Sequence, residues 1–175
     1  MSGQCARSRE SSRMLRLVVA MAVILLATPV LVRPPLAGSA QTGPSVPTAT
    51  FPDGHSFRLE IARTPEELAM GYMFREEVGS REGMLFLFPR DGFHSIWMKN
   101  CRVPLDLIWL SRGLTVVHLE KSVPPCRRDP CPSYPPMRKA GLVLEVKAGM
   151  AEKAGLGVGD SILLEGVEIT PADPP

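Results

Sequence analysis

The apolar runs of this chain are short, and that limits its fold more than any other feature of the sequence. Met84–Phe88 is an unbroken apolar run that ends at Pro89, which is typical of a central strand covered on both faces of a sheet. Phe57–Ile61 alternates apolar and polar residues, the pattern of a half-buried strand. The same reasoning predicts further strands over residues 95–98, 105–110, 114–120, 142–146 and 161–164.

Two short helices complete the predicted elements. Thr64-Pro-Glu-Glu67 has the spacing of a capping box with proline at the first helical position, so we expect a helix over 65–70. A second helix is predicted over 151–154, before a run of glycines. The chain shows no repeated alternation of strands and helices. We therefore predict a mainly β fold, a compact antiparallel β-sandwich or barrel with two short helices.

The first forty residues have the features of a leader. Four arginines precede the apolar stretch Leu17–Ala27, and the small residues Gly38–Ala40 follow it. This order predicts a signal peptide over 1–40, cleaved after Ala40 or after Ala37, and hence a periplasmic or secreted protein. The alternative is an uncleaved leader that anchors the protein in the membrane. Pro29 and Arg33 interrupt the apolar stretch and disfavour a span of about 20 residues.

The remaining chain divides into three predicted parts. Residues 41–55 are rich in proline, threonine and serine and are interpreted as a flexible spacer, 56–167 as a single β-rich domain, and 168–175 as a frayed tail. Residues 41–175 keep 15 of the 20 basic and 17 of the 18 acidic side chains, so their net charge is −2. The basic character of the whole chain belongs to the leader, and nucleic acid is not an expected partner.

Three cysteines follow the leader: Cys101, Cys126 and Cys131. Export favours a disulfide, and the proline-rich loop brings Cys126 and Cys131 close enough to form it. Closing so small a loop contributes about 2 kcal/mol, and we interpret the bridge as a staple of that loop. Cys101 is then left as a reduced, partly buried residue. The cysteines and histidines have no zinc-ligand spacing, so neither a metal nor another cofactor is predicted.

Several motifs occur in one order along the chain. They are Gly71–Arg75, Glu82–Phe86, Trp97–Asn100, Pro104–Asp106, the Cys126–Pro135 segment and Leu144–Val146. With these motifs the chain resembles exported members of the domain-of-unknown-function family 192, over about residues 56–166. The resemblance implies a compact, mainly β domain, often behind a signal peptide, and no established activity. Cys101 departs from the family, which usually has threonine there, and this weakens any role for Cys101 as a nucleophile.

The segment between residues 94 and 110 has apolar ends, typical of strands, and a polar middle. In an extended chain Trp97 and Lys99 share one face, so they can form an exposed binding platform. The alternative is that Trp97 packs under a loop. Asn100 is a residue that favours a turn. Asp106 lies in an apolar strand, so it is either buried with a partner such as Lys99, Arg75 or Arg102, or faces a cleft.

Three functions remain open from the sequence. The first is an exported binding or accessory module with a groove near Trp97, Lys99, Asn100 and Asp106, for a glycan, an envelope component or a peptide; Arg75 and Glu82 are further candidate binding residues. The second is a hydrolase that uses Glu82 and Asp106 as paired carboxylates. The third is a purely structural interaction domain. No residue is assigned a catalytic role, and the sequence leaves open whether the protein is an enzyme.

Overall fold

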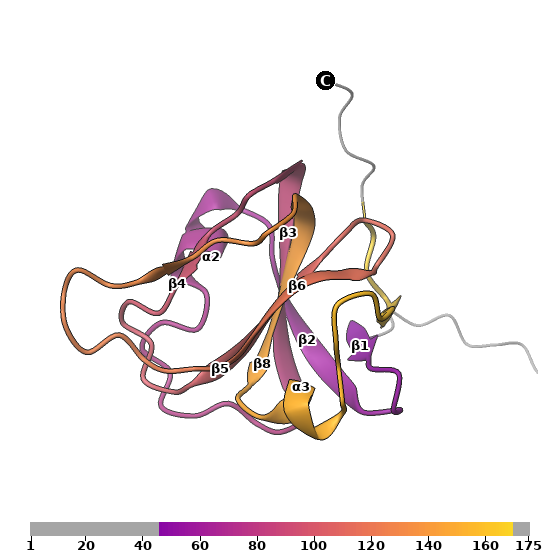
Figure 1. Ribbon diagram of the computed structural model, residues 1–175, viewed down its shortest axis with the longest axis horizontal. Helices are drawn as coiled ribbons and strands as arrows, with labels where there is room; N and C mark the ends of the chain where they lie inside the picture. The colour runs from indigo at the N-terminus through magenta and orange to yellow at the C-terminus, as the bar shows by residue number, and fades with distance from the viewer. Residues whose placement is uncertain (1–45, 170–175) are drawn as a thin grey trace, which may run out of the picture. The chain divides into compact units, whose positions relative to one another are not determined.

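The computed structural model describes residues 46–169. Most of them form a seven-stranded sheet in the order β6-β5-β8-β3-β2-β1-β9, and β4 and β7 form a separate two-stranded ribbon (Figure 1). The elements are β1 Thr48–Thr50, β2 Ser56–Ala62, α2 Pro65–Met70, β3 Glu82–Gly92, β4 Ile96–Trp97, β5 Leu105–Leu110, β6 Val116–Val123, β7 Ser133–Tyr134, β8 Ala140–Lys147, α3 Met150–Lys153 and β9 Leu163–Glu165. None of the helices in this part of the chain is long and apolar enough to span a membrane.

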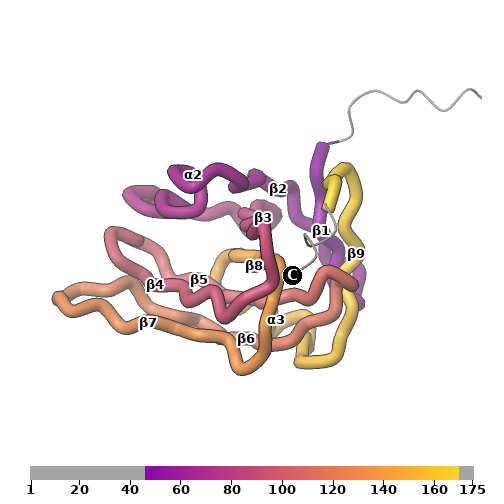
Figure 2. Tube along the Cα trace, turned by 90° about the horizontal axis from the view of Figure 1, so that it is seen from above, coloured from indigo at the N-terminus to yellow at the C-terminus, as the bar shows by residue number. Residues whose placement is uncertain are grey.

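The predicted fold class is confirmed: the domain is mainly β, with nine strands in the described residues, a curled sheet and two short helices (Figure 2). All the strand pairs are antiparallel except β2 and β3, which run parallel with Arg58 opposite Glu82. A parallel pair needs a crossover, and here α2 and the long segment after it supply the crossover. The sequence analysis missed this strand–helix–strand unit because α2 is only six residues long.

The predicted spacer over 41–55 is wrong for its second half. Residues 48–50 form β1, which pairs with β2 on one side and with β9 on the other. Ala49 and Phe51 are buried in the core. β1 contributes only one inward-facing residue, Ala49, so its sequence lacks the alternation that identifies longer strands. The predicted signal peptide and residues 41–45 lie outside the described residues.

At the other end of the domain, Ile169 packs against the core, although the sequence analysis assigned it to the tail. The rest of that predicted tail, from residue 170 onwards, lies outside the described residues.

The helix α2 has the predicted cap. The Thr64 hydroxyl accepts a hydrogen bond from the Glu67 amide at 3.2 Å, and the Glu67 carboxylate accepts one from the Thr64 amide at 3.0 Å. Gly71 ends the helix at φ 47°, and a Cβ at this position would lie 3.1 Å from a ring carbon of Phe86. Glycine therefore lets the segment after α2 pass close over β3.

The central strands carry one apolar core on each face. Leu85, Ile108 and Leu144 belong to the first core, which α3 covers through Ala151. The alternate residues of the same strands belong to the second core, which the segment after α2 covers through Tyr72. All six residues of β5 are buried, as expected of a strand covered on both faces.

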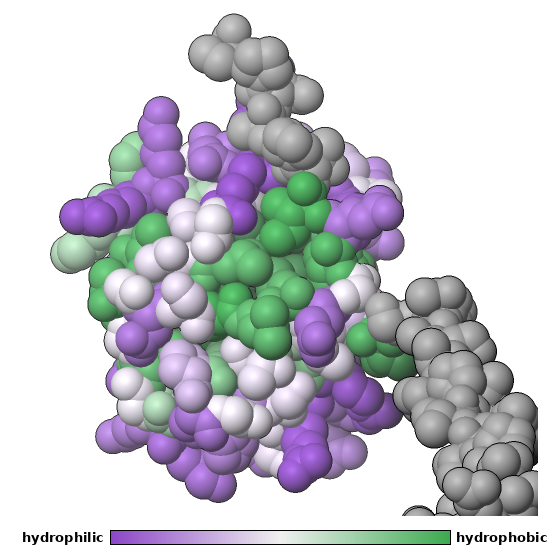
Figure 3. All heavy atoms as spheres, turned by 90° about the vertical axis from the view of Figure 1, so that its right-hand side faces the viewer, coloured by the Kyte–Doolittle hydropathy of each residue, from purple (hydrophilic) through white to green (hydrophobic). Residues whose placement is uncertain are grey.

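One side of the domain carries an exposed apolar patch. Figure 3 shows this side, on which β1 and β9 lie, with apolar residues gathered among polar ones. Val46, just before β1, and Leu163 of β9 are 60% and 57% exposed. β9 is the edge strand of the sheet and has only three residues, which limits the unpaired backbone that this edge presents.

Asp106 lies on the first face of the sheet and is completely buried. Its carboxylate accepts three backbone hydrogen bonds, from the amides of Ser122 at 2.7 Å, Gly149 at 3.1 Å and Ala151 at 2.7 Å. The carboxylate therefore joins β5 to the end of β6 and to the start of α3. The predicted burial with a partner is confirmed, but the partners are amides and not Lys99, Arg75 or Arg102.

We expect Asp106→Asn to lower the free energy of unfolding by about 3 kcal/mol or more. The asparagine amide offers one acceptor oxygen to three amide donors, and its own NH₂ group faces those donors. Urea denaturation of both proteins measures the change. Lys99→Met is the control, because Lys99 has only a solvent-exposed ion pair with Asp129 and a contact with the exposed Trp97 ring, and their loss costs about 1 kcal/mol or less. Equal stability of the Asp106→Asn variant and the parent would show that the three hydrogen bonds do not hold the fold.

Candidate functional site

A pocket of about 100 Å³ opens on the second face of the sheet, between the end of α2, β3 and β4. Most of the residues that line it are apolar, although polar atoms make up much of the surface that faces the pocket. Four aromatic rings line it, those of Tyr72, Phe86, Phe88 and Trp97, together with the side chains of Met70 and Met73. Concave shape, aromatic rings and flexible methionines are features of small-ligand sites, but the volume is below the roughly 300–1,000 Å³ of a typical one.

Glu145 of β8 is the charged residue that lines the pocket. It lies opposite Met84 of β3 and Leu107 of β5, which places it on the second face of the sheet. It is 4% exposed, and within the described residues its carboxylate has no hydrogen-bond or ion-pair partner. Burial raises the pKa of Glu145 to about 8. A buried carboxylate without a partner is costly and marks a functional site more often than a structural one.

Two more polar groups border the pocket. The Tyr72 hydroxyl is buried without a hydrogen-bond partner, and its pKa is raised by burial and by the nearby negative charge of Glu145. Burial and the charge of Glu145 also raise the pKa of Cys101 to about 11. Cys101 is a free, partly buried thiol, as predicted, and it is protonated at neutral pH. The pocket therefore offers a carboxyl group, a hydroxyl and a thiol.

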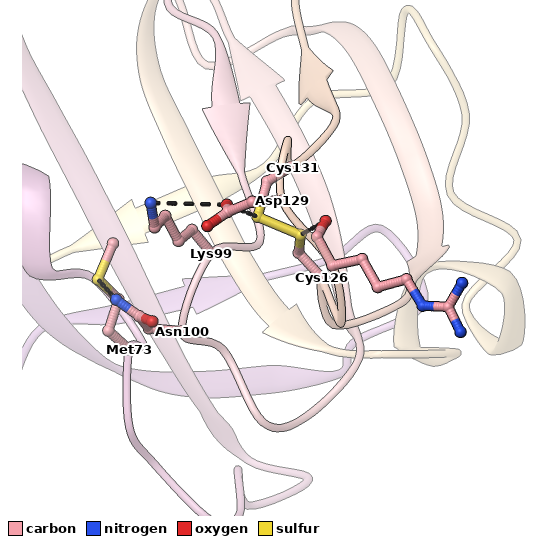
Figure 4. The surroundings of a disulfide bond; sticks show 7 residues. Met73, Lys99, Asn100, Cys126, Asp129 and Cys131 are labelled. Atoms are coloured by element: carbon pink, nitrogen blue, oxygen red, sulfur yellow. Dashed lines mark hydrogen bonds and ion pairs between the residues drawn. A yellow bond between two sulfur atoms is a disulfide. The ribbon is translucent and has the colours of Figure 1, made fainter.

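The predicted platform of Trp97 and Lys99 lies at the rim of this pocket. Trp97 is 49% exposed, which favours the exposed platform over the alternative in which Trp97 packs under a loop. The Lys99 ammonium lies 5.5 Å from the centre of the indole ring. It also lies 3.6 Å from a carboxylate oxygen of Asp129 (Figure 4). Trp97 lines the pocket, whereas Lys99 lies beyond it, over the disulfide loop.

Asn100 occupies a turn, as its residue type predicts. Its φ is 58°, in the left-handed region, and its carbonyl accepts a hydrogen bond from the Phe74 amide at 2.8 Å. Its side-chain amide lies 3.7 Å from the Met73 sulfur (Figure 4). Asn100 does not line the pocket, but it holds the Met73–Phe74 segment that forms one wall.

Arg75 supports the pocket from outside. Its guanidinium binds both carboxylate oxygens of Glu60, at 2.5 and 2.6 Å, and lies 5.0 Å from the centre of the Tyr72 ring. This hydrogen bonding lowers the pKa of Glu60. Arg75 is therefore already paired with Glu60 and packed on one face of Tyr72, and it does not neutralise Glu145.

The two carboxylates of the hydrolase hypothesis do not meet. Glu82 starts β3 and pairs with Arg58 at 3.4 Å, on the same face as Met84. Asp106 pairs in register with Val146, on the opposite face. The sheet separates the two side chains, so the predicted Glu82–Asp106 pair is wrong, and so is the prediction that Asp106 borders a groove with Trp97.

The sequence analysis missed Glu145, the most unusual residue of the pocket. A signal was present, because Glu145 is the single polar residue in the apolar run Leu142–Val146. The same reasoning identified Asp106 in its strand. Applied to both strands, it would have found two buried acids, but not which of them has partners.

The predicted disulfide between Cys126 and Cys131 is present, with the Cα atoms 5.6 Å apart (Figure 4). The backbone amides of Cys126 and Cys101 both donate to the Met98 carbonyl, at 3.1 and 3.3 Å. The disulfide loop is therefore tied to the segment that holds Cys101 and Trp97. In the described part of the chain, no group of three or more histidine, cysteine or acidic side chains is arranged to hold a metal.

Comparison with known proteins gives a family for this arrangement. The model of DUF192, described as an uncharacterized ACR family, matches residues 48–164. The chain belongs to the DUF192 family. No curated protein matches the chain.

Two solved structures have a fold similar to that of this chain. The first is a protein of unknown function from Novosphingobium aromaticivorans DSM 12444, 35% identical, with a TM-score of 0.61 over 67% of this chain and 82% of that one. The second comes from Sinorhizobium meliloti 1021 and is described as a "putative transcription regulator". It is 25% identical, with a TM-score of 0.60 over 69% of this chain and 93% of that one.

We expect Glu145→Gln to stabilise this DUF192 domain at high pH but not at low pH. Between pH 4.5 and 8 the folded protein keeps a proton on Glu145 that the unfolded chain has released, so stability falls as the pH rises through this window. Glutamine is neutral throughout and avoids that loss. Urea denaturation should show a gain of about 2–4 kcal/mol at pH 9 and little change at pH 4. The same difference at both pH values would contradict an unpaired, buried Glu145.

Proposed function

We propose that this DUF192 protein is an exported binding module that takes a small amphipathic ligand into the pocket beneath α2. One observation carries the proposal: Glu145 is buried at the pocket, and the described residues give its carboxylate no partner. The apolar part of the ligand would contact the aromatic rings and methionines. Its polar part would reach Glu145 and Tyr72.

The energetics favour a ligand over a structural role for Glu145. A structural acid is expected to have partners, as Asp106 has with its three amide donors. Glu145 instead lowers the stability of the free domain as the pH rises from about 4.5 to about 8, because the unfolded chain releases a proton that the folded protein retains. Natural proteins keep such residues where the function requires them, and a bound ligand can supply the missing partner.

The chemistry of the pocket favours binding over catalysis. A nucleophilic cysteine needs a depressed pKa or a neighbouring base, and the pKa of Cys101 is raised to about 11. Glycoside hydrolysis by paired carboxylates needs a second acidic residue, and Glu145 is the one acidic residue among those that line the pocket in the described chain. The groups that are present suit recognition of a polar head group.

The fragment test for this proposal uses the two tryptophans of the chain. We expect small amphipathic fragments to shift the indole N–H signal of Trp97 in a nitrogen–proton NMR spectrum. The Trp109 signal is an internal control, because its indole is buried and donates to the His94 carbonyl at 2.8 Å. Cys101→Leu is the matched variant, since a larger side chain at that position takes up part of the cavity and should weaken binding.

A purely structural domain would give a different result. A panel of cationic, neutral and anionic fragments would then leave the Trp97 signal unchanged in the parent protein. Shifts that persist undiminished in the Cys101→Leu variant would place the fragments elsewhere on the surface. Either result would count against the pocket as the binding site.

Export is the second part of the proposal. It is supported by the arginine-rich start and apolar run of residues 1–40, and by a disulfide, which persists in oxidising compartments. We expect the protein recovered from the cell envelope or the medium to begin at Gln41, or at Gly38 if cleavage follows Ala37. Mass spectrometry of the intact protein measures this. An envelope protein that retains residues 1–40 would instead support the uncleaved anchor.

A further inference from the structure

We propose that the head group of the ligand is a primary ammonium, which donates its N–H bonds to the Glu145 carboxylate and the Tyr72 hydroxyl. This inference rests on the proposed function and names the class of ligand that the pocket takes. It is carried by the arrangement of charge, aromatic rings and hydrogen-bonding groups around Glu145.

Burial keeps Glu145 protonated near neutral pH, so its ionised form in the pocket needs a cation beside it. Glu145 is the one acidic residue among the described residues that line the pocket, and the basic side chains nearby already have partners. Arg75 binds Glu60, and Lys99 pairs with Asp129. A carboxylate removed from water is stabilised when an opposite charge with hydrogen-bond donors contacts it directly. The ligand is the available source of that charge.

The aromatic walls suit the same kind of ligand. Ring faces attract cations, and Tyr72, Phe86, Phe88 and Trp97 surround the cavity. Two of these rings already lie near a cation of the protein itself, Arg75 at Tyr72 and Lys99 at Trp97. A carboxylate among aromatic rings is an environment that accepts an ammonium and repels an anion.

The hydrogen bonds distinguish a primary ammonium from a methylated one. A primary ammonium carries three N–H donors, and the Glu145 carboxylate and the Tyr72 hydroxyl are both acceptors without a donor in the described structure. A trimethylammonium group would contact the rings but leave both acceptors unsatisfied in a buried place. The primary group fits the ring faces and the hydrogen-bond acceptors together.

The size of the pocket limits what accompanies the head group. Its volume of about 100 Å³ is smaller than a cavity of about 150 Å³ that holds benzene. An ammonium with a short alkyl stem therefore fits, and the rest of a larger ligand would leave the pocket past Trp97, which is half exposed at the rim. A lysine side chain of a peptide and a free alkylamine share this chemistry.

The test compares four probes of similar length: n-butylammonium, N,N,N-trimethylbutylammonium, 1-pentanol and pentanoate. Each is titrated into the protein as isolated from the expressing cell, at pH 8, and followed by the Trp97 indole signal. We expect n-butylammonium to bind at least tenfold more tightly than the other three. N-acetyl-lysine methylamide then separates the sources: tighter binding than n-butylammonium assigns a peptide lysine, and weaker binding assigns a free amine.

Two variants separate a direct contact from a general effect of negative charge. Glu145→Gln should remove the preference for n-butylammonium, because the neutral amide no longer attracts the cation. Glu82→Gln removes a carboxylate from the same face of the sheet but outside the pocket lining, and it should leave the preference intact. If both variants lose the preference for n-butylammonium to a similar extent, the negative electrostatic potential of the surface selects the cation, and not contact with Glu145.

The possible failures can be told apart. If none of the four probes shifts the Trp97 signal, the pocket is not a binding site and the proposed function fails with the inference. If 1-pentanol, pentanoate or the trimethylated probe binds as tightly as n-butylammonium, the pocket binds ligands, but the primary ammonium is not what it recognises.

Discussion

The carboxylate of Asp106 is the interaction on which the rest of the structure depends. Its oxygens accept the amides of Ser122, Gly149 and Ala151, so one side chain fixes the end of β6 and the start of α3 against the central strand β5. Without it, the three amides would lose their acceptor, and that of Ala151 lies in a buried place. This anchor lies on the first face of the sheet, whereas Glu145 of β8 lines the pocket on the second face.

Two buried acids on neighbouring strands thus have opposite consequences. Asp106 and Glu145 both interrupt apolar runs, and both are almost fully buried. Asp106 lies opposite Val146 and Glu145 lies opposite Leu107, so the side chains project from opposite faces. One is satisfied by three donors and stabilises the fold, whereas the other has no partner in the described residues and its pKa is raised to about 8. The difference lies in what packs over each face, α3 on one and the segment after α2 on the other.

The sequence was sufficient where a local pattern decides the structure. The central strands, the capping box of α2 and the Cys126–Cys131 disulfide all follow from spacing and residue type. The sequence was insufficient where pairing between strands that are distant in the chain decides the structure. β1 is ordered by β2 and β9, which are distant in sequence, and β2 and β3 are parallel because of how the chain crosses over. The faces of Glu82 and Asp106 likewise depend on strand register, so their predicted pairing could not be tested from spacing alone.

The directions of the pKa shifts in the pocket favour recognition of a ligand over catalysis. Burial without a counter-charge raises the pKa of Glu145, Tyr72 and Cys101 together, which keeps each group in its neutral form over a wider range of pH. Acid–base pairs in enzymes need neighbouring groups whose pKa values are driven apart, so that one holds a proton while the other accepts it. A pocket in which the pKa values of all three groups are raised instead favours the binding of a cationic ligand. A cation that enters it would stabilise the ionised Glu145, and the energy lost by burying that carboxyl group in the free protein would be recovered as binding energy.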